Sequence, residues 1–273
     1  MIEECLENVR SISPLIHNIT NYVTVNDVAN IELACGASPI MADEPDEAED
    51  ITSICNGLNI NIGTLNKRTI EAMHLAGKKA MSLGHVILLD PVGAGASALR
   101  TNTAVDLMEE IHFDVIRGNV SELKALALGS SSTKGVDASA ADVVSDDNLD
   151  SMVAFIKDYA AKSGSIIAMT GAIDLVADDS ACYVIRNGKK EMSSITGTGC
   201  QLSGLMTAYL AANPGNKLEA AAAAVMEMGL AGEIGVSHLL PYEGNSSLRN
   251  HIIDAVYRMD GTSLRNGARY EVR

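Results

Sequence analysis

A glycine-rich turn carries the most specific chemical signal in the sequence. Residues 195–201 read Ile-Thr-Gly-Thr-Gly-Cys-Gln and lead into an apolar stretch that predicts a helix starting near Leu202. Consecutive backbone N–H groups in such a turn, at the positive end of a helix dipole, form a site for a transferring phosphoryl group. Cys200 would lie beside that anion. A helix N-terminus lowers a thiol pKa, so Cys200 is a candidate base or nucleophile. A bound phosphate would raise the pKa of the thiol again.

Charged residues follow two predicted strands. The apolar run Val86 to Leu89 leads directly into Asp90-Pro91-Val92-Gly93-Ala94-Gly95, and a second run ends in Arg117-Gly118-Asn119-Val120-Ser121-Glu122. Ligands of open α/β sheets bind beyond the carboxyl ends of the strands. Asp90 and Glu122 could organise Mg²⁺ there, and the fixed positive charge of Arg117 suits phosphate. A turn-capping role for Asp90 and a helix-capping pair of Asn119 with Glu122 remain open as purely structural interpretations.

Three other segments carry weaker signals. The polar cluster from His17 to Tyr22 has few charges and suits a small neutral ligand, although we expect His17 itself to be a structural hydrogen-bonding group. Met41 ends a predicted strand, and on its residue type alone it would be a packing residue. Thr170 and Gly171 follow another strand, where they could offer a hydroxyl and an N–H group to a nucleotide or simply form a turn.

Two further patterns are better explained by structure than by a binding site. Residues 93–98 match a relaxed dinucleotide fingerprint with Asp114 about 20 residues later, but the match is weak because several βα units precede it and no helix opens at once. The run from Asp43 to Asp50 holds six carboxylates in eight residues. Adjacent carboxylates on a helix point to different sides, so we predict a solvated helix start rather than a metal site.

The elements that must position these residues alternate in type along the chain. Apolar runs at 38–41, 58–62, 86–89, 114–117 and 166–169 predict strands that are covered on both faces. Between them, Lys67 to Leu83 has a helical apolar period, with Asn66 as its N-cap and Gly84 at its C-terminus. This alternation predicts an α/β fold with a mostly parallel central sheet and helices on both faces.

The last hundred residues depart from this alternation. Segments 175–177 and 181–186, and a strand beginning near Glu191, are separated by Asp178-Asp179 and by Asn187-Gly188, a strong signal for a tight hairpin turn. We therefore predict an antiparallel hairpin at the sheet edge. Residues 202–212, 217–238 and 246–259 predict helices, with Ala220 to Ala224 allowing close helix contacts, and Gly129 to Ala141 predicts a surface loop.

Composition excludes several classes of protein. The 273 residues carry a formal net charge of −15, which argues against a nucleic-acid partner, and 47% are hydrophobic, enough for a large core. Five scattered cysteines fit neither a disulfide framework nor a zinc site, and we expect Cys5, Cys35, Cys55 and Cys182 to be packing residues. The acidic start lacks the features of a signal peptide, so we expect a cytoplasmic protein with no membrane partner. Because no linker is apparent, we predict one domain over residues 1–273.

Taken together and in order, the segments resemble the hydroxyethylthiazole kinases, a thiamine-salvage branch of the ribokinase-like superfamily. The resemblance runs from about residue 14 to about residue 210, and its matching pieces are residues 17–21, 36–41, 61–65, 90–95, 116–119, 170–171 and 196–200. It implies the three-layer ribokinase-like fold. It also implies that ATP, with Mg²⁺, phosphorylates the hydroxyl of 4-methyl-5-(2-hydroxyethyl)thiazole.

The resemblance assigns roles by position. It places Asn21, Met41 and Gly197 at the substrate, Arg117, Thr170 and Gly199 at the nucleotide, and Asp90 and Glu122 at Mg²⁺, with Cys200 as the catalytic residue. Family members are homotrimers with active sites between subunits, so Asn21 and Met41 would act on a site that another chain completes. The superfamily at large has Asp at the position of Cys200, which implies weaker assistance to proton removal in this chain.

Three alternatives remain at this point. The nearest is another ribokinase-like kinase, acting on hydroxymethylpyrimidine or pyridoxal. A second is a hydrolase that pairs Cys200 with His17, His112 or His238. The third is a catalytically silent protein that binds and senses the thiazole.

Overall fold

A single mixed sheet forms the centre of the molecule. The computed structural model describes residues 1–128 and 143–273, so the whole of the predicted loop Gly129 to Ala141 lies outside the described residues. The strand order is β2-β1-β3-β4-β5-β6-β7-β8-β9, with β1 to β6 parallel and β7 to β9 antiparallel. The strands are β1 (Leu15–Ile19), β2 (Ser38–Met41), β3 (Gly57–Asn61), β4 (Val86–Asp90), β5 (Val115–Asn119), β6 (Ile166–Thr170), β7 (Asp174–Ala177), β8 (Cys182–Ile185) and β9 (Tyr270–Val272).

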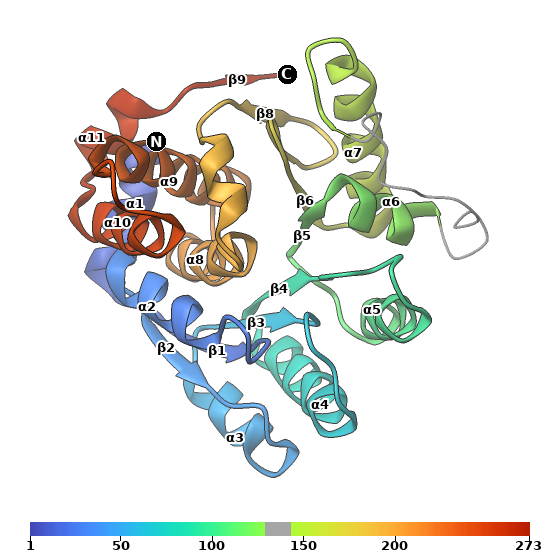
Figure 1. Cartoon of the computed structure of the whole chain (residues 1–273). Coiled ribbons are helices and arrows are strands. Elements are labelled where there is room, and N and C mark those ends of the chain that lie inside the picture. Colours follow the sequence, from blue (N-terminus) through green and yellow to red (C-terminus); the bar gives the residue numbers. More distant parts are fainter. Residues whose placement is uncertain (129–142) are drawn as a thin grey trace.

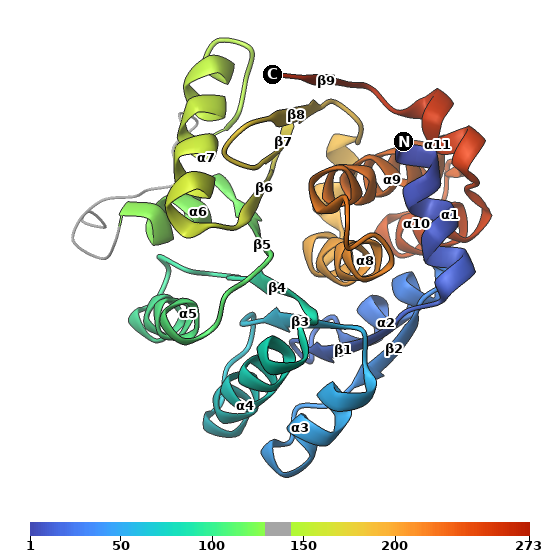
Figure 2. The ribbon, with the colours of Figure 1, turned by 180° about the vertical axis from the view of Figure 1, so that it is seen from behind.

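Helices cover both faces of this sheet (Figures 1 and 2). On one face lie α1 (Ile2–Ile12), α2 (Val25–Cys35), α8 (Thr198–Ala212), α9 (Lys217–His238), α10 (Asn245–Arg258) and α11 (Gly261–Gly267). On the other lie α3 (Pro45–Ile54), α4 (Lys67–Leu83), α5 (Ala98–Glu110), α6 (Val120–Leu128) and α7 (Leu149–Ser163). A short 3₁₀ helix, η3 (Lys190–Ser194), precedes α8. The predicted three-layer α/β fold is confirmed.

Two hydrophobic cores flank the sheet, which explains why most residues of the parallel strands are buried. One core joins Leu88 and Val115 to α8 and α9, and the other joins Leu58 and Leu89 to α4 and α7. Among the described residues, α9 is the one helix long and apolar enough to cross a membrane by composition. However, 78% of the apolar 18-residue stretch of α9 is buried inside the molecule, as in a core helix.

Local signals predicted several elements closely. Helix α4 spans Lys67–Leu83 as expected, because the Asn66 side chain accepts the N–H groups of Arg68 and Thr69 and Gly84 ends the helix in the left-handed region at φ 70°. The acidic run forms the exposed start of α3, with Pro45 in its first turn. Among the described residues no group of three or more His, Cys, Asp or Glu side chains could hold a metal ion.

Three sequence-based predictions were wrong. His17 lies in a strand, β1, where the sequence indicated only a polar cluster and no strand, because its neighbours Ile16 and Ile19 are core residues. No strand begins near Glu191, and Asn187-Gly188 is no hairpin turn, because the place beside β8 is taken by β9 from the far end of the chain. Helix α8 begins at Thr198 rather than near Leu202.

A carboxylate is fully buried where α2 packs on the sheet and α8. Glu32 on α2 accepts a hydrogen bond from Asn18 Nδ2 at 3.1 Å, while its Oε1 has no partner. Gly204 of α8 makes the room for it, since a Cβ there would stand 2.5 Å from Oε1. Burial raises the pKa of Glu32 to about 8, although the Asn18 hydrogen bond opposes the rise.

This burial predicts a pH-dependent stability. Between the unfolded pKa near 4.5 and the folded pKa of about 8, the folded chain holds a proton that the unfolded chain has released, so stability falls as pH rises through that window. Glu32→Gln removes this loss and should raise the free energy of unfolding more at pH 8.5 than at pH 5, by a few kcal/mol at roughly 1.4 kcal/mol per pKa unit. Urea unfolding at both pH values measures it. The exposed Glu71→Gln is the control, and an equal effect of Glu32→Gln at both pH values would contradict the expectation.

Candidate active site

The carboxyl edge of the parallel strands gathers most of the predicted site residues. Met41, Asp90 and Thr170 end β2, β4 and β6, and Arg117 lies near the end of β5. Asn21 follows β1 after one intervening residue. Because these strands are neighbours in the sheet, residues as far apart in sequence as 21 and 170 meet along one edge. The N-terminus of α8 faces the same edge.

The turn before α8 has the geometry of an anion site. Gly197 is the N-cap in the left-handed region at φ 86°, and a Cβ there would stand 2.2 Å from a Thr24 side-chain carbon, so only glycine fits. The first intrahelical bond runs from Gln201 N to Gly197 O. The N–H groups of Thr198, Gly199 and Cys200 therefore precede the hydrogen-bond ladder of the helix and face outward at its positive end.

Arg117 lies against this turn. A Cβ at Gly199 would stand 2.5 Å from the guanidinium, so the second glycine of the turn lets the positive charge approach the helix N-terminus. The guanidinium donates to Thr170 Oγ1 at 2.9 Å and pairs with Asp90 Oδ2 at 3.3 Å. The structure thus brings Arg117, Thr170 and Gly199 together at one place.

Asp90 is the most deeply buried charged group at this edge. It is fully inaccessible, and its Oδ2 accepts hydrogen bonds from Asn61 Nδ2 at 2.7 Å, Ser203 Oγ at 2.8 Å and Arg117. Its Oδ1 has no partner. Burial raises the pKa of Asp90, while the Arg117 charge and these hydrogen bonds lower it. One carboxylate oxygen therefore carries all the hydrogen bonds and the other, also buried, has none.

Glu122 joins the two charged loops. Its Oε1 accepts the N–H of Gly93 at 2.9 Å and its Oε2 accepts the N–H of Asn119 at 2.9 Å, while Asn119 Oδ1 accepts the N–H of Glu122 in return. The helix-capping interpretation of this pair is borne out. The same bonds hold the loop after β4 against the start of α6, so Glu122 stands near Asp90 whether or not it meets a metal.

Cys200 is held by two amides. Asn21 Nδ2 and Asn61 Nδ2 each lie 3.3 Å from its Sγ, and Asn21 Oδ1 accepts the N–H and hydroxyl of Thr24. Burial and the nearby Asp90 charge raise the pKa of the thiol, against the lowering influence of Thr24, Arg117 and Asn21. The lowering expected from the helix N-terminus is outweighed because the sulfur is almost wholly inaccessible.

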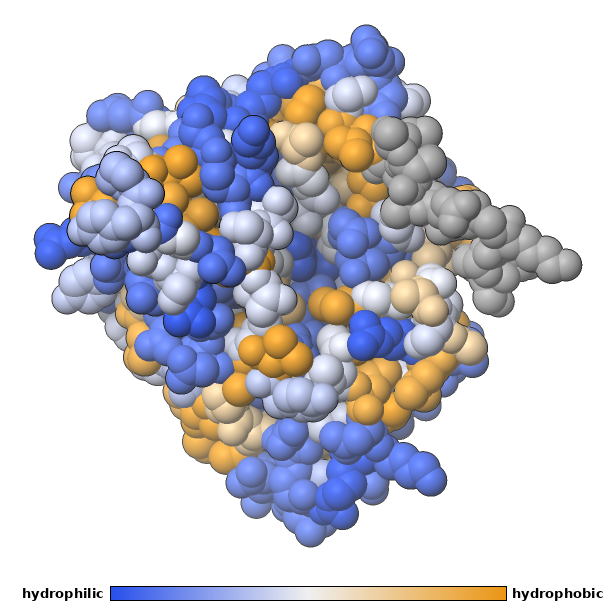
Figure 3. Space-filling model, viewed as in Figure 1, coloured by the Kyte–Doolittle hydropathy of each residue, from blue (hydrophilic) through white to orange (hydrophobic). Residues whose placement is uncertain are grey.

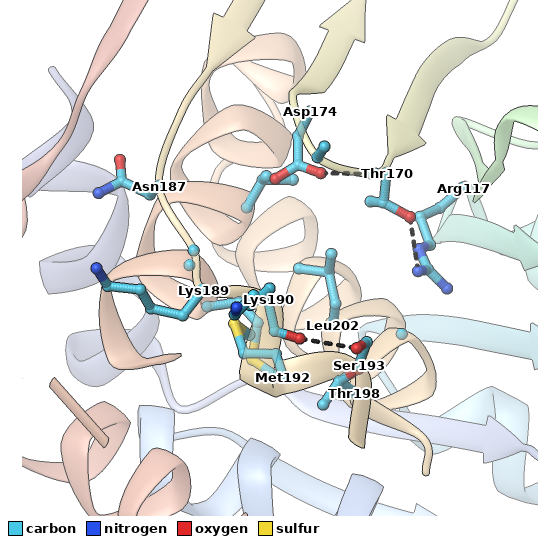
Figure 4. A pocket seen from close by; sticks show the side chains of 17 residues that line it. Arg117, Thr170, Asp174, Asn187, Lys189, Lys190, Met192, Ser193, Thr198 and Leu202 are labelled. Atoms are coloured by element: carbon cyan, nitrogen blue, oxygen red, sulfur yellow. Dashed lines mark hydrogen bonds between the residues drawn. The ribbon is translucent and has the colours of Figure 1, made fainter. Parts of the chain in front are cut away.

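A cavity of about 610 Å³ opens beside the turn. Figure 4 shows Arg117 and Thr170 on one wall, Thr198 and Leu202 of α8 below, and Lys189 and Lys190 on the opposite side. Sequence reasoning missed the two lysines. Their signal was a basic pair directly after Asn187-Gly188 in a strongly acidic chain.

Asp174 was also missed and lies at the top of the same cavity (Figure 4). Its Oδ1 accepts the N–H of Gly171 at 2.8 Å, which closes the turn that carries Thr170. Burial raises the pKa of Asp174 to about 7, although this bond and the Arg117 charge oppose the rise. Its signal was the spacing of Asp three residues after a glycine that follows a strand.

The other end of the edge is open to solvent. Tyr22 and Val23, directly after Asn21, are 80% and 57% exposed, and Leu33 on α2 is 57% exposed. Met41 and the rest of edge strand β2 are half-buried. The space-filling view shows hydrophobic atoms over the α2 and β2 region and a hollow in the middle of the same face (Figure 3).

Several alternative partners are placed elsewhere. His17 uses both ring nitrogens, on Thr52 Oγ1 at 2.9 Å and Ala42 O at 2.8 Å, so it is the structural group expected. His112 precedes β5, at the amino edge of the sheet, and His238 ends α9. Among the described residues no histidine is hydrogen-bonded to the Cys200 sulfur, so the structure gives the cysteine-hydrolase alternative no support. Asp114 also lies at the amino edge, bonded to Ile87 N, so it cannot join the glycines after β4 in a dinucleotide site.

Comparisons with known proteins agree with this geometry. Residues 6–261 match the model of the Hydroxyethylthiazole kinase family. The chain is 59% identical over 271 residues to the hydroxyethylthiazole kinase of Clostridium acetobutylicum, covering 99% of both chains. Among solved structures, hydroxyethylthiazole kinase from Pyrococcus horikoshii OT3 superposes with a TM-score of 0.88 at 31% identity, over 100% of this chain and 98% of that one.

A more distant structure shares the fold alone. Pyridoxal kinase from Staphylococcus aureus, solved in complex with AMP-PCP and pyridoxal, superposes with a TM-score of 0.60 at 15% identity, over 95% of this chain and 98% of that one. The sheet order, the site at its carboxyl edge and the family match point the same way: this chain belongs to the hydroxyethylthiazole kinase family.

Proposed function

We propose that the chain transfers the γ-phosphoryl group of ATP to the hydroxyl of 4-methyl-5-(2-hydroxyethyl)thiazole, giving the thiazole phosphate used in thiamine salvage. The observation that carries the proposal is the α8 N-terminus, whose three outward N–H groups face the strand ends that carry Asp90 and Arg117. Phosphoryl transfer needs positioning and charge neutralisation more than covalent protein chemistry, and this arrangement supplies both. The family match selects the alcohol.

The cavity beside α8 is proposed as the ATP site. Its volume of about 610 Å³ is in the range of cofactor pockets. Arg117, Thr170 and Gly199 line the end nearest the turn, where the phosphates would lie, and the exposed Lys189 and Lys190 add positive charge at the rim. In a chain of net charge −15, these cations make the cavity a local exception that attracts a polyanion.

Asp90 and Glu122 are proposed to hold Mg²⁺ with the phosphates. The unpartnered, buried Oδ1 of Asp90 is the kind of hard oxygen ligand that Mg²⁺ takes, and the lack of a richer ligand cluster among the described residues fits an ion that keeps waters and phosphate oxygens. Both Glu122 oxygens already accept backbone N–H groups, so Glu122 would act on the ion through water. When bound, Mg²⁺ neutralises phosphate charge.

The thiazole is proposed to lie near Asn21, Met41 and Gly197, at the open end of the edge. The exposed apolar residues there support a homotrimer in which a second subunit covers this side, as the family resemblance implies. Each subunit would then be one domain over residues 1–273. All five cysteines are free, which supports a reducing cytoplasm as the place of action.

In the proposed reaction the alcohol oxygen forms a bond to the γ-phosphorus as the bond from that phosphorus to the β-bridging oxygen breaks. The N–H groups of Thr198, Gly199 and Cys200 would stabilise the phosphoryl oxygens, and Arg117 would neutralise charge on the departing side. The alcohol proton leaves late. Cys200 assists its removal only weakly, because burial keeps the thiol protonated near neutral pH.

The first experiment measures ADP formation by the purified protein with ATP and Mg²⁺, with and without hydroxyethylthiazole. We expect thiazole-dependent ADP and a product whose mass is that of the phosphorylated thiazole. Hydroxymethylpyrimidine and pyridoxal are run beside it. Faster turnover of either would assign a different alcohol, and thiazole binding without ADP would indicate the sensor.

Variants at Cys200 test its role as a weak base. Cys200→Asp supplies a stronger acceptor in the place of the thiol and should retain or raise kcat. Cys200→Ser should lower kcat modestly, by about tenfold or less, which is below the roughly 10²- to 10⁴-fold contribution of an efficient general base. Steady-state kinetics at saturating ATP measures both. Complete loss of activity in Cys200→Asp would rule out the base role.

Tyr22→Asp tests the proposed intersubunit site. A charge at an exposed residue costs little in a monomer but is unfavourable in an apolar interface, so we expect a smaller assembly by light scattering and a loss of thiazole turnover. Tyr257→Asp is the matched control, because Tyr257 is 68% exposed on α10. An unchanged assembly with unchanged kinetics would contradict the placement.

A further inference from the structure

Asn61 is a buried residue that the proposed reaction leaves without a role. It ends β3, one strand from Asp90, and is fully inaccessible. Its Nδ2 lies 2.7 Å from Asp90 Oδ2 and 3.3 Å from Cys200 Sγ. A single amide therefore touches both the carboxylate and the thiol of the candidate active site.

The orientation of this amide is fixed by its neighbours. Asn61 Oδ1 accepts the Gly63 N–H at 2.8 Å and the Asn21 Nδ2 at 3.0 Å, two groups that can only donate at that position. With the amide reversed, the Asn61 NH₂ group would face the N–H donors of Gly63 and Asn21. The Asn61 oxygen would then face the Asp90 carboxylate. Its two N–H bonds are consequently aimed at Asp90 and at Cys200.

The second amide completes the arrangement. Asn21 Oδ1 is taken by Thr24, so the Nδ2 of Asn21 also presents an N–H to Cys200 Sγ, at 3.3 Å. The sulfur thus accepts from two oriented donors on one side. Its own proton must therefore point away from these two donors.

We propose that Asn61 is a positioning residue for the phosphoryl transfer, which fixes the Cys200 sulfur as a hydrogen-bond acceptor and ties its position to the Asp90 carboxylate. This inference rests on the proposed function. It goes beyond that function because it makes Cys200 and Asp90 one unit, joined by an amide that meets neither ATP nor the alcohol. The part of its contribution to kcat that runs through Cys200 should vanish when the sulfur is absent, and only the smaller part that runs through Asp90 should remain.

Ser203 provides a matched control. Its hydroxyl donates to the same Asp90 oxygen as Asn61, at 2.8 Å, but its other bond goes to Gly199 O and not to the sulfur. Asn61→Ala and Ser203→Ala therefore each remove one donor from Asp90, and only the first removes a donor from Cys200.

The experiment is a pair of double-mutant cycles with Cys200→Ala, read as kcat and KM for the thiazole. We expect Asn61→Ala to lower kcat about tenfold in the native background and less than twofold when Cys200 is alanine, with KM little changed in both, as for an interaction used in the transition state. Ser203→Ala should lower kcat by the same factor in both backgrounds. Melting temperatures confirm that each variant is folded.

A second readout does not depend on turnover. Asn61→Asp keeps the shape of the side chain but sets an oxygen where the N–H faced the sulfur. We expect methyl methanethiosulfonate to modify Cys200 at least about fivefold more slowly in this variant, because the sulfur loses an N–H donor that stabilises the thiolate. Peptide mass spectrometry distinguishes modification of Cys200 from that of the other cysteines. In the Ser203→Ala control, Cys200 should be modified at the native rate.

Each outcome decides one question. An equal kcat loss for Asn61→Ala in both backgrounds, or an unchanged modification rate in Asn61→Asp, overturns the positioning role. If Asn61→Ala does not fold or Cys200→Ala is inactive, the modification rates decide alone. If the native protein makes no thiazole-dependent ADP, the proposed function fails, and the modification rates still show whether Asn61 controls the sulfur.

Discussion

The burial of the Asp90 charge is the constraint on which the rest of the site depends. A carboxylate out of contact with water is costly unless its lone pairs are taken, and Asp90 satisfies one oxygen with donors from β3, β5 and α8. Those three donors lie far apart in sequence, so only the assembled sheet can supply them. The other oxygen has no hydrogen-bond partner, and under the proposed function it is the one that would meet Mg²⁺.

The candidate active site has two sides, toward β6 and toward β2, and a single chain encloses the first more fully than the second. On the β6 side the chain forms a walled cavity with its own lysines, arginine and threonine. On the β2 side the edge strand is half-buried and Tyr22 projects into solvent. A nucleotide would therefore find its contacts in one subunit, while selection of the small alcohol would depend on whatever packs against α2 and β2.

Local chemistry explains which features could be predicted from the sequence. Asn66 and Gly84 define α4 by themselves. An apolar run followed by a charged residue located β4 and β5, although β4 ends one residue and β5 two residues later than predicted. The role of Asn187 could not be predicted, because its amide bonds to Gly267 and Arg269 replace the turn that its neighbour Gly188 suggests. The role of Asn61 could not be predicted either, since the hydrogen bonds of an amide depend on the donors and acceptors that the fold places around it.

The pairing of β8 with β9 has a consequence for how the chain acquires activity during synthesis. Asn187 lines the cavity, and the backbone groups that hold it belong to residues made 80 and 82 positions later. Closing so long a loop is slow compared with forming the local βα units. On the ribosome, the sheet from β1 to β6 can assemble while one wall of the cavity is still unanchored. Nucleotide affinity should therefore be among the last properties that the emerging chain gains.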